Sequence, residues 1–137
     1  MTKITIHAKI KANAEKVWQA LNDPKAIEQW NHATDDWYCF NATNDLRVGG
    51  LLKSTMAAKD GSFAFDFEAI YDEITPNKFL KYHLTDGREV TITIVEKDNL
   101  VDFTEMFEAE NTNSVELQQA GWQAILNNFK KYVENLV

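Results

Sequence analysis

Residues 113–134, NSVELQQAGWQAILNNFKKYVE, decide the fold that this sequence predicts. At about 100° per residue, the apolar side chains of this run gather on one side of a helix, and the polar ones gather on the other. A helix of roughly 23 residues is about 35 Å long, since each residue adds about 1.5 Å. It is the one predicted element long enough to cover the apolar face of a sheet.

Two features inside this helix carry predictions of their own. Asn113 and Glu116 have the Asn-x-x-Glu form of a capping box, which predicts that Asn113 caps the start of the helix. Gly121, in the middle, costs about 1 kcal/mol relative to alanine. We therefore expect a close approach between Gly121 and the sheet.

The sheet is predicted by alternation of apolar and polar residues with a period of two. Residues 3–11 alternate cleanly, and residues 35–110 follow the same period over about six strands. Turn sequences separate several of these strands: Asp60-Gly61, Thr75-Pro76-Asn77, Asp86-Gly87 and Asp98-Asn99.

Two short helices are predicted between the first strand and the others. Asn13 is a suitable N-cap for the first of them, and Asp23 followed by Pro24 marks the start of the second. The element order predicts an α+β, helix-grip fold for residues 1–137 as a single domain. In it, a curved antiparallel sheet of six to seven strands wraps around the long C-terminal helix and leaves a pocket beneath the two short helices.

Charge and composition restrict the classes of partner. The formal net charge of −7 disfavours binding to nucleic acids and to anionic membranes. No apolar run reaches the length of a membrane span or of a signal-peptide core, which predicts a cytoplasmic protein without a membrane partner. One cysteine, Cys39, and three dispersed histidines give no metal-ligand spacing, so we expect neither a metal nor a cofactor.

Several sequence segments, spread over nearly the whole chain, carry a family resemblance: Ala14-Glu15-Lys16-Val17-Trp18, Asp23-Pro24, Trp30, Asp45-Leu46-Arg47-Val48-Gly49-Gly50, Tyr71, Glu73-Ile74-Thr75-Pro76 and Gly121-Trp122. Their order resembles the START-like (SRPBCC) helix-grip superfamily, and within it the family named after activators of the heat-shock-protein-90 ATPase. Further segments are similar to a bacterial subgroup of small stand-alone members: Trp30-Asn31, Asp36-Trp37, Phe65-Asp66-Phe67 and Glu105. The resemblance implies the fold and a ligand-sized cavity.

Glu105 is the most informative single residue, because alternation places it between two phenylalanines on the inward face of its strand. A carboxylate there is costly unless it is paired or neutralised, and its pKa is expected to rise. One interpretation is that Glu105 orients a ligand or acts as an acid or base. The other is that it pairs with Arg47, Arg88 or Tyr82, or that a bulge turns it outward.

The predicted ligand-binding residues are mostly aromatic, as in many small-molecule sites: Trp30, Trp37, Met56, Phe65, Phe67, Tyr82, Phe103, Glu105, Phe107, Gln118 and Trp122. Plain core packing explains each tryptophan equally well. Gln118 is either a second polar group in the pocket or part of a frayed, solvent-exposed first turn of the helix.

Three functions remain open from the sequence. The first is binding of an apolar or aromatic small molecule. The second is an enzyme of the cyclase, dehydratase or hydrolase type, with Glu105 as acid–base and His32 or Asp36 assisting. The third is a module that interacts with a chaperone, which would require an exposed apolar patch. The polar faces of the predicted strands do not indicate such a patch.

Overall fold

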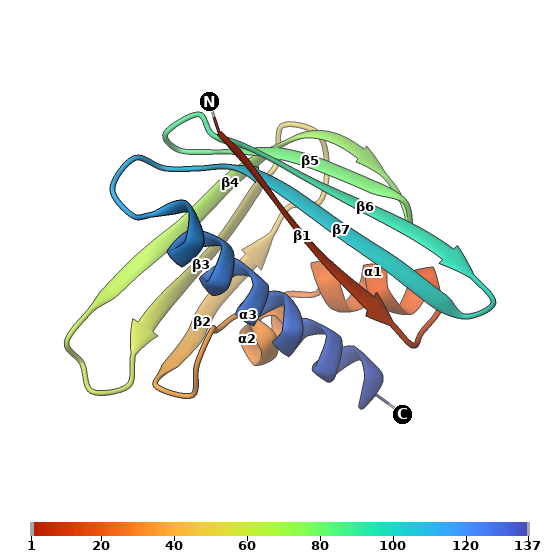
Figure 1. The fold of residues 1–137 in the computed structure, drawn as a ribbon, viewed down its shortest axis with the longest axis horizontal. Helices are drawn as coiled ribbons and strands as arrows, with labels where there is room; N and C mark the ends of the chain where they lie inside the picture. Colours follow the sequence, from red (N-terminus) through yellow and green to blue (C-terminus); the bar gives the residue numbers. More distant parts are fainter. Residues whose placement is uncertain (1, 137) are drawn as a thin grey trace.

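The computed structural model describes residues 2–136, so the two ends of the predicted domain, Met1 and Val137, lie outside the described residues. The strands are β1 (Lys3–Ile10), β2 (Trp37–Asn44), β3 (Leu51–Ala58), β4 (Ala64–Thr75), β5 (Phe79–Leu84), β6 (Glu89–Lys97) and β7 (Leu100–Glu108). The helices are α1 (Ala14–Asn22), α2 (Pro24–Trp30) and α3 (Val115–Glu134). This order confirms the predicted α+β, helix-grip fold (Figure 1).

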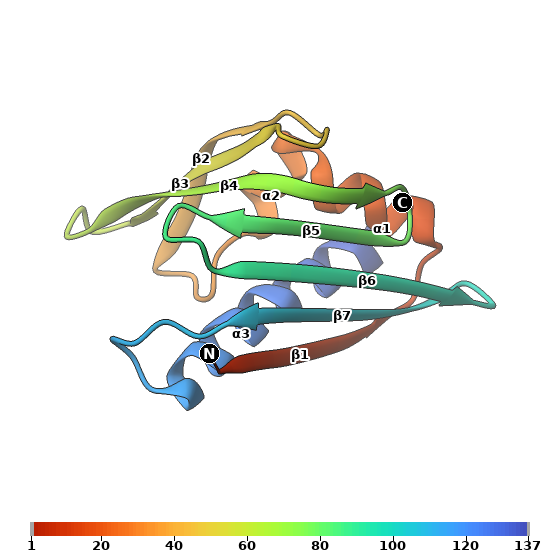
Figure 2. The same cartoon turned by 90° about the horizontal axis from the view of Figure 1, so that it is seen from above.

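Within residues 2–136, seven strands form one antiparallel sheet in the order β1-β7-β6-β5-β4-β3-β2. Strands that follow one another in sequence pair directly, except that β1 lies beside β7 at one edge. Figure 2 shows the sheet curling, with all three helices on its concave side. The helices therefore lie against the apolar face of the sheet.

The core lies between this concave face and α3. Phe103 and Phe107 of β7 and Phe129 of α3 are each only 1% exposed. The ring centroids of Phe103 and Phe129 are 5.4 Å apart, within the usual range for aromatic pairs. The inward-facing residues of the strands and the apolar side of α3 thus form one core, as predicted.

The two short helices start where the sequence predicts. The side chain of Asn13 accepts a hydrogen bond of 2.8 Å from the backbone nitrogen of Lys16. Asp23 accepts one of 3.1 Å from Lys25, and Pro24 is the first helical residue. Both carboxylate and amide caps satisfy backbone donors that the first helical turn leaves free.

Two predictions about α3 are wrong. Its N-cap is Ser114, whose hydroxyl accepts from the backbone nitrogen of Leu117 at 3.1 Å, whereas Asn113 turns its side chain to Glu110. At Gly121, a Cβ atom would meet no heavy atom within 4 Å, so the glycine allows no close approach to the sheet.

None of the described helices is both long enough and apolar enough to cross a bilayer. This finding agrees with the absence of a long apolar run from the sequence.

Candidate functional site

A pocket of about 330 Å³ lies between the sheet and the helices. Strands β3 to β7 supply one wall, and α1, α2 and α3 supply the other. The pocket exists because α3 packs along β1 at one edge of the curved sheet while α2 packs on β2 at the other. A straight helix cannot follow a curved sheet over its whole width, and the space between these two contacts stays open.

Nine of the eleven predicted ligand-binding residues line this pocket: Trp30, Met56, Phe65, Phe67, Tyr82, Phe103, Glu105, Gln118 and Trp122. The other two, Trp37 and Phe107, do not belong to its lining. Trp37 begins β2 and packs against Phe63 and Phe65, with ring centroids 6.0 and 6.1 Å away. The ring of Phe107 is covered by Trp122, which stacks on it at 3.8 Å.

Glu105 faces inward in a regular part of the sheet. It pairs with Ile92 of β6 and with Ile6 of β1, and both isoleucines are buried. No bulge interrupts either ladder at this point. The alternation that the sequence predicts therefore holds, and the carboxyl group reaches the pocket.

The carboxyl group of Glu105 has no partner among the described residues. Burial alone raises its pKa from 4.5 to about 8, with no hydrogen bond or ion pair acting against that rise. Every fully sealed side-chain nitrogen or oxygen in residues 2–136 has a hydrogen-bond partner. The unpartnered oxygens of Glu105 are consequently open to the pocket.

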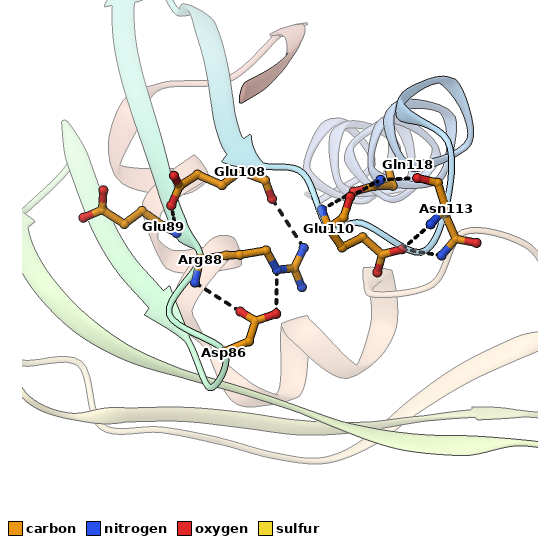
Figure 3. Close-up of polar contacts among 7 residues, drawn as sticks. All are labelled: Asp86, Arg88, Glu89, Glu108, Glu110, Asn113 and Gln118. Carbon is orange, nitrogen blue, oxygen red and sulfur yellow. Dashed lines mark hydrogen bonds and ion pairs between the residues drawn. The ribbon is translucent and has the colours of Figure 1, made fainter. Parts of the chain in front are cut away.

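None of the three partners considered for Glu105 binds it. Arg47 pairs with Asp45 at 2.8 Å on the surface. Arg88 pairs with Asp86 at 2.7 Å and donates to the backbone oxygen of Glu108, as Figure 3 shows.

Tyr82, the third of those partners, is buried on β5 and also lacks a hydrogen bond to its hydroxyl group in the described residues. Burial raises its pKa well above 10, and the nearby charge of Glu105 adds to the rise. Its ring packs edge-on against Phe67 and Tyr71, with centroids 6.4 and 6.0 Å away. The hydroxyl of Tyr71, by contrast, donates to Asn44 at 2.8 Å.

Gln118 lines the pocket, but its amide is used by the loop between β7 and α3. The amide oxygen accepts from the backbone nitrogen of Glu110 at 2.9 Å, and the amide nitrogen donates to the backbone oxygen of Asn113 at 2.8 Å (Figure 3). Gln118 is buried, so the first turn of α3 is not exposed to solvent at this residue. Its role in the structure is to fix where α3 begins.

Sequence reasoning missed several pocket residues: Asn22, Asn31, Ser54, Tyr71, Arg88, Glu110 and Phe129. Phe129 carried a signal, since it lies on the apolar side of the predicted helix. Arg88 carried a weaker one, because the Asp86-Gly87 turn places it at the end of the sheet. The buried residues Asn22 and Ser54 gave no signal in the sequence.

The two residues proposed to assist Glu105 in catalysis lie elsewhere. Neither His32 nor Asp36 lines the pocket. The backbone oxygen of His32 accepts a hydrogen bond from Asn128, and that of Asp36 accepts one from Lys59. Both lie in the loop that joins α2 to β2, where Asn31 lines the pocket but His32 and Asp36 do not.

An exposed aromatic cluster, which the sequence did not indicate, lies around the hairpin between β3 and β4. Phe63 is 58% exposed and Phe65 is 43% exposed, and both rings pack against Trp37. In Figure 1 this hairpin extends beyond the layer of helices, which explains why residues with inward parity stay uncovered. Such a cluster is the feature that a protein-interaction module would need.

The curved sheet, the long helix that it grips and the pocket between them define the START-like helix-grip class. Within that class, the chain belongs to the family described as "Activator of Hsp90 ATPase homolog 1-like protein", whose model matches residues 11–134. This result confirms the resemblance seen in the sequence. No functionally curated protein is significantly similar to this chain.

Solved structures of bacterial proteins share both sequence and fold with it. An AHSA1-like protein from Aeromonas hydrophila is 43% identical, with a TM-score of 0.91, over 97% of this chain and 92% of that one. A protein from Cytophaga hutchinsonii is 46% identical, with a TM-score of 0.84 and the same coverage. A protein from Chromobacterium violaceum is 25% identical, with a TM-score of 0.89, over 99% of this chain and 100% of that one.

Proposed function

We propose that this protein binds an apolar or aromatic small molecule in the pocket between the sheet and α3. The observation that carries the proposal is the composition of the pocket wall. Apolar and aromatic side chains make up most of it, and two polar groups, on Tyr82 and Glu105, reach the pocket without a partner. A volume of about 330 Å³ falls at the lower end of the range for small-molecule sites.

The wall is also organised before any ligand arrives. The indole nitrogen of Trp30 donates to the backbone oxygen of Ala20 at 2.9 Å, and its ring packs edge-on against Phe129 at 4.9 Å. Because these contacts fix the rings, a ligand does not have to order them on binding, and less affinity is lost. Apolar surface that leaves water then contributes about 25 cal/mol per Å².

Native mass spectrometry of protein purified without detergent tests the proposal, together with titration of a neutral apolar naphthalene probe. Phe67→Ala removes a ring from the pocket, whereas Phe63→Ala removes an exposed ring near the same strand and serves as the control. We expect bound ligand or probe in the wild type and in Phe63→Ala, and at least tenfold weaker binding in Phe67→Ala. Equal loss in both variants, or no binding to the wild type, would contradict the proposal.

A second candidate function is supported by the protonation behaviour of Glu105. A carboxyl group with a pKa near 8 exchanges its proton close to neutral pH, which is what a general acid or base requires. An enzyme of the cyclase, dehydratase or hydrolase type would use it alone among the predicted catalytic residues, since His32 and Asp36 lie outside the pocket. Conversion of a bound ligand that stops in Glu105→Gln while binding persists would favour the enzyme over the carrier.

A further inference from the structure

Tyr82 and Glu105 lie on the same inner wall of the pocket with one strand between them. Tyr82 pairs with Val90 of β6, and Glu105 pairs with Ile92, two residues further along the same strand. Residues two apart on a strand point to the same face of a sheet. The two side chains therefore enter the pocket from neighbouring inward rows, and they are close enough for the charge of Glu105 to affect Tyr82.

No positive charge in the pocket wall is free to neutralise Glu105. The other titratable groups in the wall are Tyr71, Arg88 and Glu110. The guanidinium of Arg88 is paired with Asp86, the Tyr71 hydroxyl is bonded to Asn44, and Glu110 accepts from Asn113. An unpaired carboxylate in apolar surroundings is much less stable than the neutral acid, so the geometry favours the protonated form.

A protonated carboxyl group and a tyrosine hydroxyl each carry one O–H that needs an acceptor. Leaving such a donor unsatisfied in a desolvated site weakens the binding of the ligand that desolvates it. A hydrocarbon ligand would remove water from both donors and offer neither of them an acceptor. A ligand with an oxygen atom at this point would satisfy both at once.

We propose that the molecules bound here carry a carbonyl or phenolic oxygen on an apolar skeleton, and that Tyr82 and the protonated Glu105 both donate hydrogen bonds to that oxygen. This inference rests on the proposed function and specifies its ligand class. Two donors on one oxygen also stabilise negative charge there, so the site would favour the enolate or phenolate form of a ligand.

The test compares naphthalene probes that share one skeleton. They are 2-acetylnaphthalene, which carries an acceptor, 2-isopropylnaphthalene, which carries none, and 1-(2-naphthyl)ethylamine, which carries a cation. Dissociation constants are measured by quenching of tryptophan fluorescence at pH 6.5. We expect the ketone to bind about tenfold more tightly than the hydrocarbon, because only the ketone accepts hydrogen bonds from the two donors; tenfold corresponds to about 1.4 kcal/mol.

Variants of Tyr82 and Glu105 test whether these two side chains cause the preference for the ketone. Tyr82→Phe and Glu105→Leu should each reduce the preference for the ketone several-fold, while hydrocarbon affinity is kept or improved. Glu105→Gln should retain the preference because an amide still offers an N–H donor. The preference should also decline above about pH 8 in the wild type, as Glu105 ionises, and stay constant in Glu105→Gln.

Each outcome decides the matter. Equal binding of ketone and hydrocarbon would overturn this inference and leave the proposed function intact. Tighter binding of the amine would also overturn it, because it would mean that Glu105 is ionised in the pocket. Failure of all three probes would contradict the proposed function as well. If Glu105→Leu does not fold, as judged by circular dichroism, Glu105→Gln and the pH profile still decide.

Discussion

Glu105 differs from most carboxylates in protein cores, which are held by cations or by several hydrogen bonds. Its neighbours along β7, Phe103 and Phe107, are almost fully buried, and its cross-strand partners are isoleucines. Retaining a carboxyl group in such a position reduces stability. A residue that weakens the fold and faces a pocket is typical of a functional site.

Replacing Glu105 with glutamine should change how stability depends on pH. The pKa is about 8 in the folded protein and near 4.5 when unfolded. Below pH 4.5 both states hold the proton, whereas between these values only the unfolded state loses it, so wild-type stability falls as pH rises. Glu105→Gln should therefore be more stable than wild type at pH 8, by on the order of a few kcal/mol, with a smaller difference at pH 5.

Urea unfolding at pH 5 and pH 8 measures this difference. Glu73→Gln is the matched control, because Glu73 is an exposed glutamate on β4. Parallel pH profiles for wild type and Glu105→Gln would show that Glu105 is ionised in the folded protein, against our account.

At the scale of elements, the start of α3 is fixed by local hydrogen bonds. Ser114 caps the helix, Asn113 bonds to Glu110, and Gln118 ties the preceding loop to the first helical turn. Because α3 carries a large share of the pocket wall, its start also sets where Trp122 and Phe129 lie. Local capping and the shape of the site are thus connected.

Ser114→Ala should lower the free energy of unfolding by about 1 kcal/mol, the usual cost of losing an N-cap. Asn113→Ala should cost less, since its side-chain bond to Glu110 is exposed to water. Chemical denaturation of both variants provides the comparison. A larger loss in Asn113→Ala would restore Asn113 as the residue that caps the helix.

Gly121→Ala should stabilise the protein by about 1 kcal/mol, because alanine is the better helix former and its methyl group would meet no heavy atom within 4 Å. Gly87→Ala offers a contrast, since φ is +88° at Gly87 and alanine is strained there. Thermal unfolding should show a higher midpoint for Gly121→Ala and a lower one for Gly87→Ala. A lower midpoint for Gly121→Ala would indicate a contact that the structure does not show.

At the scale of the whole molecule, periodicity predicted the fold and nine of the residues in the pocket wall. Alternation correctly placed Glu105 inward, and the apolar stripe correctly placed Phe129 and Trp122 opposite the sheet. A period of two tells which face a side chain is on, but it does not tell what lies opposite that face. Trp37 and Phe63 show the limit, since their rings pack on each other outside the pocket wall.

The absence of partners for Glu105 is a second property that no sequence pattern could supply. It depends on where Arg47 and Arg88 find their own carboxylates, Asp45 and Asp86, each two residues away in sequence. These short-range pairs engage both arginines, and neither arginine binds the carboxyl group of Glu105. Only the assembled structure distinguishes this arrangement from a buried ion pair.

The most direct test of a ligand-binding pocket is an NMR titration of ¹⁵N-labelled protein with 2-acetylnaphthalene, monitored at the tryptophan indole N–H signals. Single Trp→Phe variants assign the signals. The account predicts saturable shifts for Trp30 and Trp122, which line the pocket, and none for Trp37, which lies outside it. Shifts confined to Trp37, or no saturable shift at any tryptophan, would contradict the account.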